Sequence, residues 1–414
     1  MERGEVAHET AGGGGAGRPV LPLDGFLVLD FSQFLAGPVA ALRLADLGAR
    51  VIKIERPRTG DLGRTLAFAG MTLDGDTLSF QIMNRGKESY AADLKDGPDL
   101  AAVRRLVAQA DVLIQNFRPG VMERIGLDYP SVRAINPRIV YGSVSGYGPD
   151  GPWRDLPGQD LLAQSISGLP WLSGSRDDGP VPVGLSIADL LASCHLAQGV
   201  TALLLRRERT GEGGLVETSL MEGMLDLQFE LLSAHLNDPS VVVERGGPHG
   251  ANAFLSAPYG VYPTADGFLA LAMNPVPRIG SLIGLAALEA FADPASWWTE
   301  RDRIEALLAG HLRQASTEHW LAILQPADVW CAPVLTLPEL VDHEGFRALH
   351  MDQEVRRTAV DGEGEARLRT TRSPLRIDGA VLRQNRGAPR LGEHTAAIDS
   401  ERGLRAAPVP GTGA

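Results

Sequence analysis

The sequence predicts an α/β protein built on a doubly wound, parallel, Rossmann-like sheet, because short apolar strands alternate with helical segments from Pro22 onward. The series opens with the strand Phe26–Phe31, the helix Pro38–Gly48 and the strand Arg50–Glu55. Proline favours the first turn of a helix, and glycine favours its end. Since β-α-β crossovers are right-handed and join parallel strands, these two strands are expected in one parallel sheet.

The alternation continues through the middle of the chain. Leucines and valines recur at helical spacing in Pro98–Ala110, which runs into the apolar strand Asp111–Phe117. Two short helices, a strand, a long helix, a strand and a last helix are expected to follow at residues 121–125, 129–135, 138–148, 188–207, 215–219 and 220–236. This order is typical of a sheet with helices on both faces.

The character of the sequence changes near Pro239, where glycine, proline and aromatic residues become frequent. Helix–strand alternation returns at Thr317 and indicates that the C-terminal part rejoins the first sheet. We therefore expect five parts: disordered tails at 1–20 and 399–414, a large domain from 21–215 plus 317–398, a linker helix at 216–240, and a small α+β domain at 241–316.

Composition limits the classes of partner. A formal net charge of −12 argues against nucleic acid and anionic membranes, so a polyanionic ligand would need a local basic cluster. Two cysteines, Cys194 and Cys331, exclude a disulfide framework and indicate a reducing cytoplasm. We find no secretory signal, no run of about 18 apolar residues and no zinc-type ligand spacing, so neither a membrane span nor a metal site is expected.

The first β-α turn lies where a doubly wound sheet binds its ligand. A dinucleotide fold would carry G-x-G-x-x-G here, but the turn has only Gly37, followed by Pro38, so a nicotinamide cofactor is not expected. Basic residues follow several of the predicted strands, namely Arg56, Arg58, Lys87, Arg118 and Arg124. Each alone is more often a solvated surface charge, but together they indicate a phosphate-rich ligand crossing the crevice.

Six blocks resemble the class III CoA-transferase family, which contains formyl-CoA transferase and carnitine-CoA transferase as well as the α-methylacyl-CoA racemases. They are LDGFLVLDFSQFLAGPVAALRLADLGARVIKIERPRTGD, NRGKESYAADLK, DVLIQNFRPGVMERIGLDY, NPRIVYGSVSGYGPDGP, SAPYGVYPTADG and PRLGEHT. They run in family order from Leu23 to Thr395. The resemblance implies an acyl-CoA donor, a carboxylate acceptor, coenzyme A as carrier with no tightly bound cofactor, a CoA-binding large domain and an interlocked-ring homodimer.

Asp189 is the one ionisable residue in the stretch Pro182–Ser193. From spacing alone it is an acid in the first turn of a helix, which is common at an α/β junction. The resemblance implies instead that it is the nucleophile, forming a mixed anhydride and then an aspartyl-CoA thioester. Small and apolar neighbours would exclude water from these intermediates; they are Gly184, Ile187, Ala188 and Leu190.

Two residues before the long helix bear on the reaction type. The racemase branch carries a histidine where this chain has Gln159, and an amide moves no proton near neutral pH, so racemisation is disfavoured. Asp160 matches an acid near the active site of transferase members, which implies a positioning role. Its alternative is a simple helix N-cap.

The resemblance also implies the CoA contacts. It assigns the first turn to Phe34, Leu35 and Ala36, the adenosine end to Arg56, and the crevice to Lys87, Asn116, Phe117 and Arg124. Leu35 replaces a glutamine of formyl-CoA transferase, and Arg245–Ala253 replaces its tetraglycine loop, with Gly246 and Gly247 as the counterpart. Both departures favour a larger or less polar acid than formate or oxalate.

A second candidate nucleophile, the pair Cys194 and His195, has less support from the sequence. Cys194 and His195 are neighbours on a helix and point in different directions, so a Cys–His nucleophile is disfavoured and Cys194 is expected in the core. The hypothesis is an acyl-CoA:carboxylate CoA-transferase with Asp189 as nucleophile. The alternatives are an acyl-CoA racemase or isomerase, and a non-catalytic CoA-binding subunit.

Overall fold

The computed structural model describes residues 20–240 and 244–405. The large domain is built on a six-stranded sheet in the order β5-β2-β1-β6-β7-β8, and every neighbouring pair is parallel. The strands are β1 Leu27–Asp30, β2 Arg50–Glu55, β5 Glu88–Ala91, β6 Val112–Gln115, β7 Val140–Ser145 and β8 Gly214–Ser219. The predicted α/β fold with a parallel sheet is therefore confirmed.

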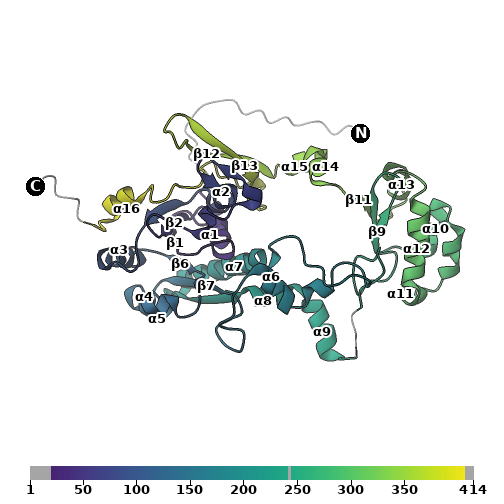
Figure 1. The fold of residues 1–414 in the computed structure, drawn as a ribbon, viewed down its shortest axis with the longest axis horizontal. Helices are drawn as coiled ribbons and strands as arrows, with labels where there is room; N and C mark the ends of the chain where they lie inside the picture. The colour runs from purple at the N-terminus through teal and green to yellow at the C-terminus, as the bar shows by residue number, and fades with distance from the viewer. Residues whose placement is uncertain (1–19, 241–243, 406–414) are drawn as a thin grey trace, which may run out of the picture.

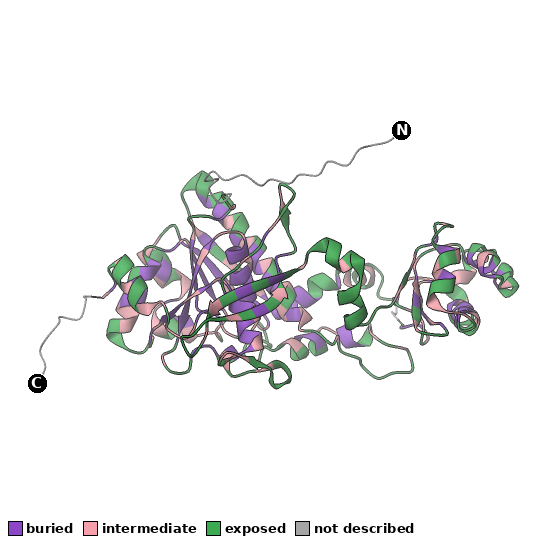
Figure 2. Cartoon of the chain, turned by 90° about the horizontal axis from the view of Figure 1, so that it is seen from above, coloured by how far each residue is buried: buried purple, intermediate pink, exposed green. Residues whose placement is uncertain are grey.

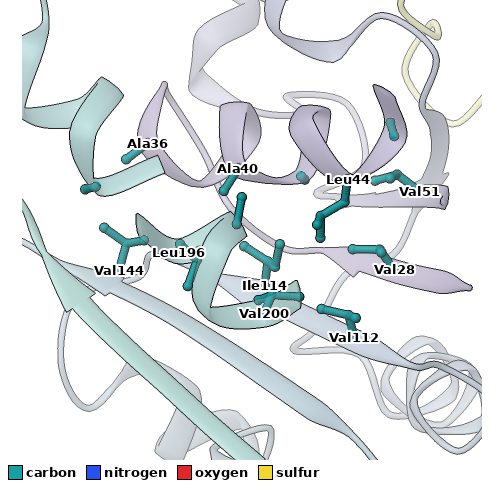
Figure 3. Packing of buried hydrophobic residues seen from close by; sticks show 14 of the residues in the cluster. Val28, Ala36, Ala40, Leu44, Val51, Val112, Ile114, Val144, Leu196 and Val200 are labelled. Carbon is teal, nitrogen blue, oxygen red and sulfur yellow. The ribbon is translucent and has the colours of Figure 1, made fainter. Parts of the chain in front are cut away.

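Helices cover both faces of this sheet (Figure 1). On one face α1 (Ala36–Asp46) and α7 (Ile187–Thr210) bury alanine, leucine and valine side chains against the strands (Figure 3). On the other face the core includes residues of α3 Gly97–Val107, α4 Val121–Ile125, α5 Tyr129–Ile135 and α16 Thr395–Arg402. The strand order reverses between β2-β1 and β6, so the first turn lies at the switch point where such sheets bind ligands.

Among the helices within 20–240 and 244–405, α7 is the one long and apolar enough to cross a membrane by length and composition. Its buried side chains include Leu196, Val200 and Leu204, which pack in the same cluster as residues of α1 and the sheet. These contacts make α7 a core helix of the large domain.

The small domain lies apart from the large one, with its own buried centre (Figures 1 and 2). Its antiparallel sheet contains β9 Gly260–Pro263, β10 Phe268–Leu271 and β11 Cys331–Pro333. Around it lie α10 Val276–Ile283, α11 Ser296–Thr299, α12 Arg301–Leu312 and α13 Thr317–Leu324. Since Trp320 and Leu324 lie in this core and β11 pairs with β10, the predicted boundary at residue 316 is too early.

The chain then returns to the large domain without adding a strand to the six-stranded sheet. It passes through α14 Leu337–Asp342, α15 Glu344–Leu349 and the hairpin of β12 Asp352–Thr358 with β13 Glu365–Thr371. Next to α16, the His394 N–H donates to Ser89 O at 3.1 Å, and Asp399 accepts from the Tyr90 hydroxyl at 2.7 Å.

Two predicted boundaries in the large domain also change. The tail predicted at 399–414 begins inside α16, and Leu404 is buried, so residues 399–405 belong to the fold. The linker helix predicted at 216–240 contains most of β8 and two helices, α8 Leu220–Leu227 and α9 Phe229–Asn237. Residues 1–19 and 406–414 lie outside the described residues.

Candidate active site

The turn between β1 and α1 lies between the ends of two other strands. Gly37 is required there, because a Cβ at this position would come 2.2 Å from the Ser32 Cβ. On the β6 side, Asn116 Oδ1 accepts the Gln33 N–H and Asn116 Nδ2 donates to the Gln33 carbonyl, both at 2.8 Å. On the other side Arg56 follows β2. The fold thus gathers the predicted first-turn residues, Asn116, Phe117 and Arg56 at one sheet edge.

Asp189 lies in the first turn of α7, as predicted, and its carboxylate accepts a hydrogen bond from the Ala36 backbone N–H. Burial and the nearby negative charge of Asp160 raise the pKa of Asp189 to about 7, while the Ala36 N–H opposes this rise. Asp189 forms no ion pair with any described residue. Its carboxylate is therefore held by the N-terminus of α1 rather than by a cation, a setting typical of functional carboxylates.

Asp160 is the first residue of α6 (Asp160–Ile166), yet its side chain caps a different helix. Its Oδ2 accepts the N–H of Ala188 at 2.7 Å and the N–H of Asp189 at 3.1 Å. The predicted alternative, an N-cap of its own helix, is therefore replaced by a cap on α7 that fixes the backbone of Asp189.

Gln164 supports this cap and was not found from the sequence. Its Nε2 donates to Asp160 Oδ1 at 2.5 Å, and its Oε1 accepts the Val183 N–H at 3.0 Å. The amide joins α6 to the segment that leads into α7. Its partners lie 4 and 19 residues away along the chain, and no motif connects them.

The expected exclusion of water from Asp189 is only partly present in one chain. Ala188 is buried and Ile187 is half-buried, but Gly184 and Leu190 are exposed. Leu185, also beside the site in sequence, is 71% exposed. A ligand or a second polypeptide would have to cover this side of the site.

The predicted basic contacts separate into two groups. Arg56 and Arg124 are exposed, and neither forms an ion pair within the described ranges. Lys87 is fully buried, and its ammonium donates at 2.8 Å to Asp30 Oδ2, Pro38 O and Asn84 Oδ1. All three donors are occupied, so the structure places Lys87 in the interior and not along the crevice.

A cavity of about 460 Å³ is lined by residues of β6, β7 and β8 and by the loops and helices next to them. Phe117 lines it, together with Arg118 and Arg154 from neighbouring loops. Arg154 was not singled out from the sequence, because it lies in a loop without a motif. The two guanidinium groups offer planar donors for a phosphate.

Gly246 and Gly247 do not contact Asp189 in this chain. The Gly246 carbonyl accepts the Arg176 N–H at 2.9 Å, and the Gly247 N–H donates to Asp302 Oδ1 at 3.3 Å. The loop thus lies against α12, and its following residues line a cavity of about 610 Å³ with residues 172–178.

Cys194 and His195 do not form a nucleophile–base pair in the described residues. Cys194 is exposed, so its predicted core position is wrong: the side chain lies on the outward face of α7. His195 Nε2 pairs with Asp226 Oδ2 at 3.1 Å. The described residues contain no group of three or more His, Cys, Asp or Glu side chains that could hold a metal ion.

Comparison with known proteins places these features in a family context. The family described as CoA-transferase family III matches residues 23–395. The succinate–glutarate CoA-transferase of Agrobacterium fabrum is 33% identical over 391 residues, covering 92% of this chain and 95% of that protein. The acetyl-CoA:oxalate CoA-transferase of Acetobacter aceti is 33% identical, covering 93% of this chain and 96% of its own length.

Solved structures agree. A CAIB/BAIF family protein from Brucella suis superposes with a TM-score of 0.79 at 31% identity, covering 92% of this chain and 99% of that one. A hypothetical protein from Mycobacterium tuberculosis gives a TM-score of 0.78 at 29% identity, covering 92% and 100%. Both comparisons extend over the large and the small domain.

Proposed function

This chain belongs to CoA-transferase family III and is a CoA-transferase, and from this premise we propose that it moves coenzyme A between two carboxylic acids by covalent catalysis on Asp189. The observation that carries the proposal is the Asp189 carboxylate, which has no cation beside it among the described residues and accepts the Ala36 N–H at the sheet's switch point. A carboxylate without a counter-ion keeps its electron pair available for attack.

The first half of the reaction loads CoA onto the protein. A carboxylate oxygen of Asp189 bonds to the thioester carbonyl carbon of the donor, and the carbon–sulfur bond breaks to release CoA thiolate. The thiolate then attacks the Asp189 carbonyl carbon of the mixed anhydride, which gives an aspartyl-CoA thioester and the free donor acid.

The second half reverses these steps with the acceptor. Its carboxylate attacks the aspartyl thioester and releases CoA thiolate, and the thiolate then attacks the acceptor's acyl carbon. The products are the new acyl-CoA and the regenerated Asp189 carboxylate. No proton or electron is consumed overall, so the exchange needs no cofactor beyond CoA.

The Ala36 N–H and Asp160 determine the electrostatic environment and the orientation of the Asp189 carboxylate. The Ala36 N–H is aimed at the oxygen that carries negative charge whenever Asp189 or its tetrahedral adduct is anionic. Asp160 holds the backbone N–H groups of Ala188 and Asp189 and thereby fixes the direction of the side chain. Its charge raises the pKa of Asp189 and so makes the free carboxylate a stronger base.

We propose that CoA lies along the crevice from Arg56 past the turn Phe34–Ala36 to Asn116, Phe117 and Arg124. The exposed guanidinium groups suit the CoA phosphates. Since the leucines beside Asp189 are exposed, we also propose that a second copy covers them in a homodimer. We also propose a cytoplasmic location, which the two unpaired cysteines support.

Relatives suggest which acids to test. Proteins similar to this chain are named for succinate with glutarate and for acetyl-CoA with oxalate, so a dicarboxylic acid is the proposed substrate class. Incubation with succinyl-CoA and glutarate, and with acetyl-CoA and oxalate, should yield the exchanged acyl-CoA by chromatography. Unchanged turnover in Asp189→Ala would contradict the proposal, and no turnover with any pair would favour a CoA-binding subunit.

Racemisation, the other reaction associated with the family, is not proposed for this chain. Gln159, where the racemase branch has a histidine, is exposed and its amide cannot shuttle a proton. In deuterated buffer a racemase would exchange the α-hydrogen of a 2-methylacyl-CoA, and a transferase would leave it in place.

A further inference from the structure

The turn between β1 and α1 contains a backbone conformation that its sequence does not favour. Phe34 has φ of 64°, in the left-handed region that only glycine and a few polar residues adopt easily. The Phe34 side chain is 45% exposed, so packing of the ring does not impose this conformation. Such strain persists when surrounding contacts hold it in place, and it gathers at functional sites.

Asp61 provides that contact. Its Oδ1 accepts the Phe34 N–H at 3.2 Å and the Gly63 N–H at 2.8 Å. Asp61 lies in the loop after β2 and is only 2% exposed. The carboxylate thus ties the strained residue to a part of the chain 27 residues away.

Asp61 is itself held rigidly. Its Oδ2 lies 2.8 Å from Lys53 Nζ, and its backbone N–H donates to Glu55 Oε2 at 3.0 Å. The fully buried Lys53 also donates to the Ser32 carbonyl at 2.7 Å. The Lys53–Asp61 ion pair therefore holds the turn at two points, because Lys53 binds the Ser32 carbonyl and Asp61 binds the Phe34 N–H. Asn116 holds Gln33 between them.

The backbone conformation of Phe34 sets the direction of the Ala36 N–H, two residues later. The Ala36 N–H, which reaches the Asp189 carboxylate, opens α1 directly after the left-handed residue. If Phe34 relaxed to an ordinary φ, the path of Leu35 and Ala36 would turn and the N–H would point elsewhere.

We propose that Asp61 is a positioning residue for the transfer reaction, acting through the backbone of Phe34 to aim the Ala36 N–H at Asp189. The inference rests on the proposed function of Asp189. Asp61 itself touches neither substrate nor the reacting atoms.

The test compares Asp61→Ala with Asp76→Ala, each assayed with succinyl-CoA and glutarate. Asp76 is a matched control, because it belongs to the same ion network through Arg64 at 2.9 Å and Arg357 at 2.8 Å but does not touch the turn. We expect Asp61→Ala to lower kcat about 10²-fold with little change in KM, as a misdirected group does. Asp76→Ala should keep the wild-type kcat.

The pH profile gives a readout that a purely structural role would not move. The Ala36 N–H favours the ionised form of Asp189, while burial and Asp160 oppose ionisation. Losing this N–H should shift the rising limb of kcat/KM to higher pH in Asp61→Ala. An unshifted limb, or a kcat equal to that of Asp76→Ala, would overturn the inference.

A second pair of variants keeps the buried Lys53–Asp61 ion pair and tests the role of the Phe34 backbone if Asp61→Ala does not fold. Phe34→Asn keeps a residue that tolerates the left-handed region, and Phe34→Val introduces one that does not. We expect kcat to fall far more in Phe34→Val than in Phe34→Asn, and the rising limb of kcat/KM to shift to higher pH in Phe34→Val. Equal kcat in the two variants would overturn the inference. Full turnover in Asp189→Ala would instead overturn the proposed function.

Discussion

Of the carboxylates that contact the chain between the end of β1 and the start of α1, Asp30 and Asp189 have pKa values shifted in opposite directions. Asp30 accepts the Ser32 N–H at 3.0 Å, and Asp189 accepts the Ala36 N–H. Burial alone would raise the pKa of Asp30, but Lys53 and Lys87 lower it to about 2. Burial and Asp160 raise that of Asp189 to about 7.

The difference lies in the cations. Lys87 Nζ is 2.8 Å and Lys53 Nζ is 3.7 Å from Asp30, whereas Asp189 has an acid as its charged neighbour. A buried acid paired with cations is chemically unreactive, and its removal destabilises the fold because the cations lose their partner. An unpaired one beside helix N-termini is suited to attack a thioester.

The largest effect is expected when Asp189 is changed to asparagine. The amide has the same shape but cannot form the anhydride, so kcat should fall by at least about 10³-fold. Because the ionised Asp189 is destabilised by burial, stability at pH 8 should be unchanged or higher. Steady-state kinetics and urea unfolding check both, and a modest loss of kcat would mean that Asp189 and Asp30 do not differ in chemical role.

Asp30→Asn should have the opposite profile, a loss of stability. Removing one partner of a buried charge cluster leaves Lys53 and Lys87 undercompensated, at a cost of about 3–5 kcal/mol. Because the folded pKa of Asp30 is lowered, its contribution exists above pH 3.8 and is lost as pH falls through about 2. Urea unfolding at pH 7 measures it. Asp150→Asn, at an exposed position, is the control.

Glu305 in α12 is a buried acid outside the active site. It is 1% exposed, and neither carboxylate oxygen has a hydrogen-bond partner among residues 20–240 and 244–405. Burial raises its pKa to about 7, with Arg301 opposing. Since the folded pKa is raised, stability falls as pH rises from 4.5 through 7.

Glu305→Gln should remove that dependence. The variant should match the wild type at pH 4.5 and exceed it at pH 8 by up to about 3 kcal/mol. Paired urea titrations at the two pH values test this. A stability difference that does not change with pH would show that Glu305 is ionised normally.

The smallest expected effect concerns Asp160→Asn. In the wild type kcat/KM should rise with pH around an apparent pKa of about 7, because the ionised Asp189 attacks. The asparagine can still accept the Ala188 and Asp189 N–H groups but carries no charge, so the limb should move down by about one pH unit. A rising limb that moves to higher pH instead would mean that Asp160 affects Asp189 more by capping α7 than by its negative charge.

The sequence predicted local features well. Apolar strands and helices repeat over short ranges, so the parallel sheet and the place of Asp189 in the first turn of α7 followed from pattern. Contacts between distant segments were missed. Asp160 caps a helix 28 residues away, and β11 pairs with β10 some sixty residues earlier.

Burial explains the two misplaced side chains. Lys87 lies in a polar stretch that reads as surface, yet Asp30, 57 residues earlier, draws it into the interior. Cys194 lies in an apolar helix that reads as core, but its face of α7 points outward. The exposure of Lys87 is thus set by a distant carboxylate and that of Cys194 by the orientation of its helix, and neither can be read from the local sequence.

The covalent step itself offers the most direct measurement. Hydroxylamine added during turnover of succinyl-CoA with glutarate should intercept an activated Asp189 and convert it to a hydroxamate, which peptide mass spectrometry would locate. We predict modification at Asp189 that requires the acyl-CoA and is absent in Asp189→Asn. An active enzyme that remains unmodified at Asp189, or is modified at a different acid, would contradict covalent catalysis by this residue.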